Sequence, residues 1–89
     1  MIERELLIQN RLGLHARATA KLVQTASVYR CAATVAAKGR EVNAKSIMGV
    51  MLLAAGKGST VVIRTDGEDE AAAMDAIAAL FDRRFDEDA

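Results

Sequence analysis

Residues Asn10-Arg11-Leu12-Gly13-Leu14-His15-Ala16-Arg17-Ala18 organise the chain, because a loop passes into a helix within this stretch. Gly13 permits a turn that a residue with a β-carbon would resist, and residues 16–26 have helical spacing. His15, the only histidine, therefore falls at the helix N-cap, where backbone N–H groups lack intrahelical partners. Such N–H groups attract phosphate, and the guanidinium of Arg17 matches phosphate oxygens geometrically. The stretch predicts a histidine that carries a phosphoryl group.

The composition predicts a single domain over residues 1–89 and argues against several classes of function. Lys and Arg number 12, as do Asp and Glu, so the basic excess typical of nucleic-acid binding is missing. A charged N-terminus and the lack of a long apolar run predict a cytoplasmic protein without membrane insertion. Cys31 is the only cysteine, so we expect neither a disulfide nor a metal site, and no motif indicates a cofactor.

Apolar spacing and turn residues predict the element order βαββαβα. Strands are expected at residues 2–8, 31–37, 40–42 and 60–64, and helices at residues 16–26, 47–53 and after Glu68-Asp69-Glu70. In the first helix the expected buried stripe consists of Ala16, Thr19, Ala20, Val23 and Ala26 or Ser27, with Leu22 beside it. In the last helix it consists of Ala71, Met74, Ile77 or Ala78, and Phe81. Lys38-Gly39 should form a hairpin turn, and the glycines of Gly56-Lys57-Gly58 should end the short helix. An antiparallel sheet with helices over one face would bury these stripes, but a ferredoxin-like topology has a similar order.

Two sequence motifs help to choose between these two topologies. They are Leu14-His15-Ala16-Arg17-Ala18 and, about thirty residues later, Lys45-Ser46-Ile47-Met48-Gly49-Val50-Met51 followed by Gly56-Lys57-Gly58. Together they resemble the HPr family, the histidine phosphocarriers of the bacterial phosphotransferase system, and the resemblance covers nearly the whole chain. It implies an α+β fold, an open-faced two-layer β-sandwich. In that fold a four-stranded antiparallel sheet, ordered first, fourth, second, third, carries three helices on one face.

The resemblance also implies a phosphocarrier rather than an independent turnover enzyme. Enzyme I, charged by phosphoenolpyruvate, would pass a phosphoryl group to His15, which would pass it to enzyme IIA domains. Arg17 and the backbone N–H of Ala16 would hold the phosphate. The alternative is an HPr-like regulatory module that acts by binding partners. The end of the chain resembles the nitrogen-related paralogue NPr, whereas residues 45–49 resemble the HPr of the sugar system.

Ser46 has two expected roles. A serine directly before a helix is a typical N-cap. The resemblance adds phosphorylation by an ATP-dependent HPr kinase/phosphorylase, which would place nearly two negative charges beside the partner surface and weaken docking.

The short helix at residues 47–53 is apolar almost all round, so it cannot bury every side. Ile47, Met48 and Met51 are expected to be exposed in part and to bind partners, deeper burial under neighbouring loops being the alternative. Around them Lys21, Lys45, Arg17 and Arg11 would form a basic rim that attracts acidic partner faces. We expect the protein to be a monomer.

Two further features complete the expectations. Ala18 stands where the family's motif has proline, which should loosen the first helical turn and leave the N–H groups of Ala16 and Arg17 in place. Asp86-Glu87-Asp88 at the end of the chain is expected to be a solvated tail.

Overall fold

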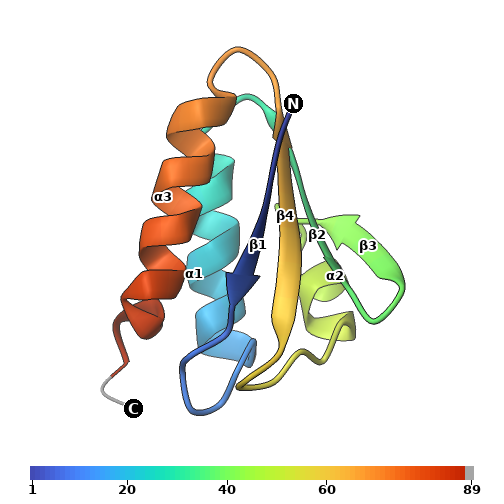
Figure 1. Ribbon diagram of the computed structural model, residues 1–89, viewed down its shortest axis with the longest axis vertical. Coiled ribbons are helices and arrows are strands. Elements are labelled where there is room, and N and C mark those ends of the chain that lie inside the picture. Colours follow the sequence, from blue (N-terminus) through green and yellow to red (C-terminus); the bar gives the residue numbers. More distant parts are fainter. Residues whose placement is uncertain (88–89) are drawn as a thin grey trace.

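The computed structural model describes residues 1–87 and contains the predicted elements in the predicted order (Figure 1). They are β1 (Ile2–Leu7), α1 (Ala16–Ser27), β2 (Ala32–Ala37), β3 (Arg40–Asn43), α2 (Ile47–Leu52), β4 (Thr60–Asp66), α3 (Glu70–Asp82) and a closing 3-10 turn, η1 (Arg84–Asp86). The four strands form one antiparallel sheet in the order β1-β4-β2-β3, with the three helices packed on one face. The predicted α+β open-faced architecture is confirmed.

One face of the sheet is buried under the helices, since side chains alternate along each strand. Leu6, Val35, Val61 and Ile63 point into this core. The β2–β3 hairpin turns at Lys38 and Gly39, whose φ angles are 54° and 76°, as the sequence predicted.

The buried stripe of α1 differs from the predicted one. Ala16 is exposed, whereas Ala18 and Leu22 are fully buried, followed by Ala26. Alanines lie on several sides of this helix, so the apolar pattern defines its buried side poorly. Leu22, the largest apolar residue, decides it, with Ala18 and Ala26 four residues away on either side. In α3, similarly, Ala71 is exposed while Ala73 and Leu80 are buried.

The prediction that glycine ends α2 was wrong. The residue in the left-handed conformation after this helix is Ala54, with φ 48°, while Gly58, with φ 88°, belongs to the turn before β4. The N–H of Ala54 bonds to the carbonyl of Met51 at 3.1 Å and closes the last turn. The chain must turn here because the next residue, Ala55, is buried against the loop that carries His15.

Candidate phosphoryl-transfer site

The loop between β1 and α1 is fixed by close backbone packing. Gly13 has a φ of 66°, and a β-carbon there would lie 2.6 Å from the carbonyl oxygen of Ala55 and 2.6 Å from the Cα of Gly56. The N–H of Leu14 donates to the same Ala55 oxygen at 2.9 Å. Only glycine fits this position, and the contact sets the point at which α1 begins.

His15 is the N-cap of α1, as predicted. Its Nδ1 accepts the N–H of Arg17 at 3.4 Å, and its carbonyl accepts the N–H of Thr19 at 2.8 Å. The first turn is therefore closed with alanine at position 18. The imidazole is 27% exposed, and Nδ1 faces the backbone at the start of the helix.

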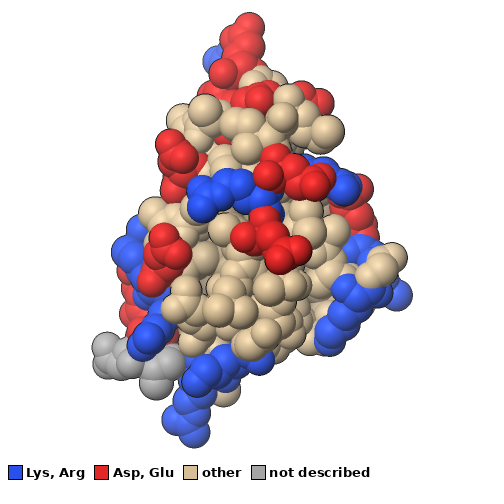
Figure 2. Space-filling view, in the orientation of Figure 1, with Lys and Arg blue, Asp and Glu red and all other residues tan. Residues whose placement is uncertain are grey.

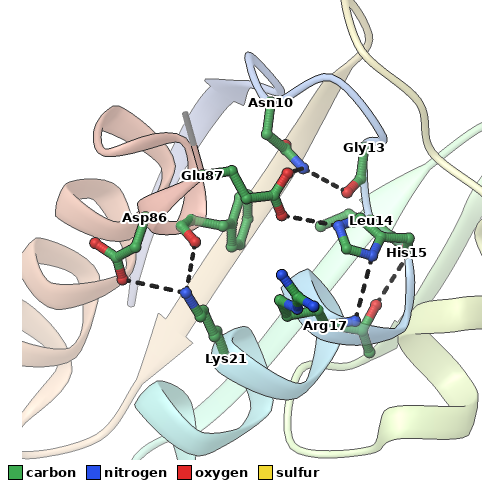
Figure 3. A network of polar contacts seen from close by, with 10 residues as sticks. Asn10, Gly13, Leu14, His15, Arg17, Lys21, Asp86 and Glu87 are labelled. Atoms are coloured by element: carbon green, nitrogen blue, oxygen red, sulfur yellow. Dashed lines mark hydrogen bonds and ion pairs between the residues drawn. The ribbon is translucent and has the colours of Figure 1, made fainter. Parts of the chain in front are cut away.

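The prediction of a solvated tail was wrong for Glu87. Its Oε2 lies 2.8 Å from Nε2 of His15, and its side chain is only 15% exposed (Figure 3). Its Oε1 accepts the amide of Asn10 at 3.3 Å, and that amide also donates to the carbonyl of Gly13 at 2.7 Å. Asp88, the last residue of the predicted tail, lies outside the described residues. The carboxylate of Glu87 thus connects the end of the chain to His15 and its loop.

A buried aromatic residue explains why the chain returns to this loop. Phe85 is fully buried, and its ring centroid lies 4.8 Å from that of Phe81 in α3. The Nζ of Lys21 donates to the carbonyl of Phe85 at 2.8 Å and lies 3.5 Å from the carboxylate of Asp86. Arg84, Phe85 and Asp86 all have φ between 55° and 61°, which turns the chain sharply after α3.

The electrostatics at this end of the molecule favour a negative group. Burial alone would raise the pKa of Glu87, but hydrogen bonds from His15 and Asn10 and the charge of Arg17 lower it below the usual 4.5. Glu87 is therefore ionised near neutral pH. Arg17 is exposed on the first turn of α1. At the lower end of the face drawn in Figure 2, most charged side chains are Lys or Arg.

The second predicted site lies at the start of α2. Ser46 is its N-cap, since its Oγ accepts the N–H of Gly49 at 3.1 Å, and this prediction is confirmed. The exposure predicted for Ile47, Met48 and Met51 is also confirmed, Met48 being 73% exposed. Only Val50 of this helix is buried.

The structure does not gather the predicted basic rim in one place. Lys21 follows Arg17 by one helical turn, but its ammonium holds the η1 turn. The Nζ of Lys45 donates to the carbonyls of Tyr29 and Cys31, at the opposite end of α1 from His15.

Residues 1–87 contain neither a metal-binding cluster nor a membrane-spanning helix. No group of three or more His, Cys, Asp and Glu residues in this range could hold a metal ion. None of the helices it contains has the length and apolar character needed to cross a membrane.

Comparison with known proteins identifies the family of this chain. A family model described as the PTS HPr component phosphorylation site matches residues 2–83. The chain belongs to the HPr family. It is 62% identical over 88 residues to the phosphocarrier protein HPr of Xylella fastidiosa strain 9a5c, covering 99% of each chain. It is 56% identical to the phosphocarrier protein HPr of Cupriavidus necator, covering 98% of each.

A solved HPr structure supports the same conclusion. The crystal structure of HPr-C-His from Thermoanaerobacter tengcongensis has a TM-score of 0.97 and 40% sequence identity, and the match covers 100% of both chains. HPr proteins are phosphocarriers of the bacterial phosphotransferase system and not catalytic enzymes. The family, the fold and the phosphocarrier class predicted from the two motifs are thus confirmed.

Sequence reasoning missed two residues of the site, Asn10 and Glu87. Asn10 is completely buried, and its Oδ1 is the only buried side-chain oxygen or nitrogen in the described part of the chain without a hydrogen-bond partner. A signal for Glu87 was available in Phe85, an aromatic residue four positions after Phe81 within an otherwise charged ending. Such spacing indicates continued packing against the core.

Proposed function

We propose that this HPr-family chain accepts a phosphoryl group from enzyme I on Nδ1 of His15 and donates it to an enzyme IIA domain. The observation that carries the proposal is the contact between Nδ1 and the N–H of Arg17 at 3.4 Å. It places a ring nitrogen with a lone pair at the backbone N–H groups of a helix start, where phosphate is stabilised.

The chemistry needs few groups beyond these. Nδ1 attacks phosphorus in line, and charge spreads over the equatorial oxygens. The N–H groups of Ala16 and Arg17 and the Arg17 guanidinium are placed to receive those oxygens. Because His15 and Arg17 are accessible at the surface, a donor and an acceptor protein can reach the site in turn.

The test is phosphoryl transfer from phosphoenolpyruvate and enzyme I to the wild-type protein and to His15→Ala. The wild-type protein should acquire an acid-labile label, and His15→Ala should acquire none. Arg17→Ala should be labelled about 10- to 100-fold more slowly, since a hydrogen bond to a charged group contributes about 1.5–3 kcal/mol. Normal labelling of His15→Ala would falsify the proposal. A wild-type protein that binds enzyme I without being labelled would favour the regulatory binding module instead.

The acceptor domain distinguishes the sugar-related from the nitrogen-related pathway. Transfer from the labelled protein should be measured with a panel of enzyme IIA domains of both kinds. The pathway is the one whose domain removes the label at the lowest concentration.

We further propose that Ser46 is phosphorylated by an HPr kinase/phosphorylase. Support comes from its half-exposed position beside Ile47 and Met48, because a phosphate on Oγ would lie next to this apolar surface. Incubation with such a kinase and ATP should modify the wild-type protein but not Ser46→Ala. An unmodified Ser46 would contradict this part of the proposal.

Partners are proposed to dock on Ile47, Met48 and Met51, which are exposed on α2. Exposed methionines adapt to differently shaped surfaces, which suits a carrier with several partners. Met48→Lys should weaken binding to enzyme I, measured by titration calorimetry. The control is Val28→Lys, which alters an exposed residue at the end of α1 and should leave binding unchanged. We propose that the protein acts as a cytoplasmic monomer, which sedimentation measurements can test.

A further inference from the structure

The contact between Glu87 and His15 defines which ring nitrogen carries the hydrogen. An ionised carboxylate can only accept a hydrogen bond, so Nε2, 2.8 Å from Oε2, must be the donor. At the other side of the ring, Nδ1 accepts the N–H of Arg17. Both contacts select the neutral ring with hydrogen on Nε2 and the lone pair on Nδ1 (Figure 3).

Glu87 is itself held in a fixed orientation. Its Oε1 accepts the amide of Asn10 at 3.3 Å, and that amide is anchored at 2.7 Å by the carbonyl of Gly13. One carboxylate oxygen therefore faces Asn10 and the other faces His15. The end of the chain and the loop before α1, 72 residues apart in sequence, form one hydrogen-bonded unit.

The η1 turn does not need this contact for its attachment. Phe85 is buried, and its carbonyl and the carboxylate of Asp86 are both bound by Lys21. Glu87 follows these anchors and places its carboxylate on the imidazole. A residue that served only to fasten the turn would not have to meet Nε2.

We propose that Glu87 is a positioning residue for phosphoryl transfer, holding His15 in the tautomer whose Nδ1 can attack and stabilising the charge that the ring gains. The inference rests on the proposed function of His15. When Nδ1 shares its lone pair with phosphorus, the bond from phosphorus to the donor breaks and its electron pair stays with the donor. The ring keeps the hydrogen on Nε2 and becomes positively charged, next to the carboxylate. On transfer to the acceptor, the electron pair of the N–P bond returns to Nδ1.

A carboxylate that orients a histidine in this way resembles the aspartate of a Ser-His-Asp triad, which holds the imidazole tautomer and stabilises the imidazolium. Carboxylates that orient metal-binding histidines contribute about 10- to 100-fold to affinity or activity. We expect an effect of about that size on the rate of transfer from enzyme I.

Glu87→Gln is the sharpest variant, because Asn10 determines how the new amide lies. The Asn10 amide donates, so the carbonyl oxygen of the glutamine will face it and the glutamine NH2 will face Nε2. Nε2 must then accept, and the ring hydrogen moves to Nδ1. We expect 15N NMR of the unphosphorylated protein to show the Nδ1–H tautomer in place of Nε2–H, and transfer to slow by about 10- to 100-fold.

Asp75→Asn is the matched control. It makes the same chemical change, carboxylate to amide, on an exposed side chain of α3 that takes no part in the contacts around His15, Glu87 and Lys21 described above. It should leave both the tautomer and the transfer rate as in the wild-type protein. Glu87→Ala is a second variant, which should weaken the tautomer preference, since only the N–H of Arg17 then selects it, and should also slow transfer.

Three results would overturn the inference: an unchanged tautomer in Glu87→Gln, a changed tautomer with a wild-type transfer rate, or an equal slowing in Asp75→Asn. The tautomer is measured without any phosphoryl donor, so the contact is tested even if His15 is not the acceptor. Failure of the proposed function would appear separately, as an unlabelled wild-type protein.

Discussion

The N-termini of α1 and α2 are capped in the same way and surrounded differently. His15 Nδ1 accepts a backbone N–H two residues later, and Ser46 Oγ accepts one three residues later. Ser46 forms its contact within its own helix, whereas His15 is also held from outside by Glu87, from the far end of the chain. A local cap fixes the start of a helix, and the tertiary contact also holds the second ring nitrogen of His15.

Removing the anchor of the η1 turn should release Glu87 from His15 and cause the largest loss of stability. Phe85→Ala removes a fully buried ring that packs on Phe81, and we expect a loss of about 3–5 kcal/mol in the free energy of unfolding. Urea unfolding gives the value, with Met48→Ala as an exposed control that should change it by less than about 0.5 kcal/mol. A loss below that of the control would mean that Phe85 does not hold the turn.

The loop before His15 can be disturbed separately. Gly13→Ala should cost about 2–5 kcal/mol, because it combines left-handed strain with a clash against Ala55 and Gly56. Gly39→Ala is the matched control, since Gly39 also has positive φ but open space around it, and it should cost about 1–2 kcal/mol. Equal midpoints in thermal unfolding would contradict the close packing of the loop.

The cap of α2 can be removed without touching His15. Ser46→Ala should lose about 1 kcal/mol, the usual contribution of a serine N-cap, because the N–H of Gly49 loses its acceptor. Labelling by enzyme I should continue at a rate close to that of the wild-type protein. A complete loss of labelling would show that the two caps are coupled.

The smallest expected effect is the loss of stability when the carboxylate of Glu87 is protonated at low pH. The pKa of Glu87 is lower in the folded protein, so its carboxylate contributes stability that is present above the usual value of 4.5 and is lost as pH falls through the lowered pKa. The NMR signals of the Asn10 side-chain amide should therefore shift with a midpoint below 4.5, while the N–H of Gly49, bonded to a serine, should not follow that titration. A midpoint at or above 4.5 would contradict the contact.

Local patterns predicted most of the fold because most helices and strands have signals within a few residues of sequence. The β2–β3 turn, the β-branched run of β4 and the acidic start of α3 each lie within a few residues. The buried face of α1 was predicted wrongly because alanines lie on several sides of the helix and do not mark which side is buried. The end of α2 was also predicted wrongly. The chain turns there because Ala55 packs on the loop of His15, and no glycine is needed.

By itself the sequence determined that His15 begins a helix with Arg17 beside it, and that Ser46 begins another. These are relations between residues two or three positions apart, which the geometry of a helix start fixes. Only the tertiary structure decided what lies on the other side of the imidazole. Burial of Phe85 against α3 brings Glu87 to Nε2, and no pattern within a short window can report a contact between residues 72 positions apart. The N-cap position of His15 was therefore readable from the chain, and its contact with Glu87 was not.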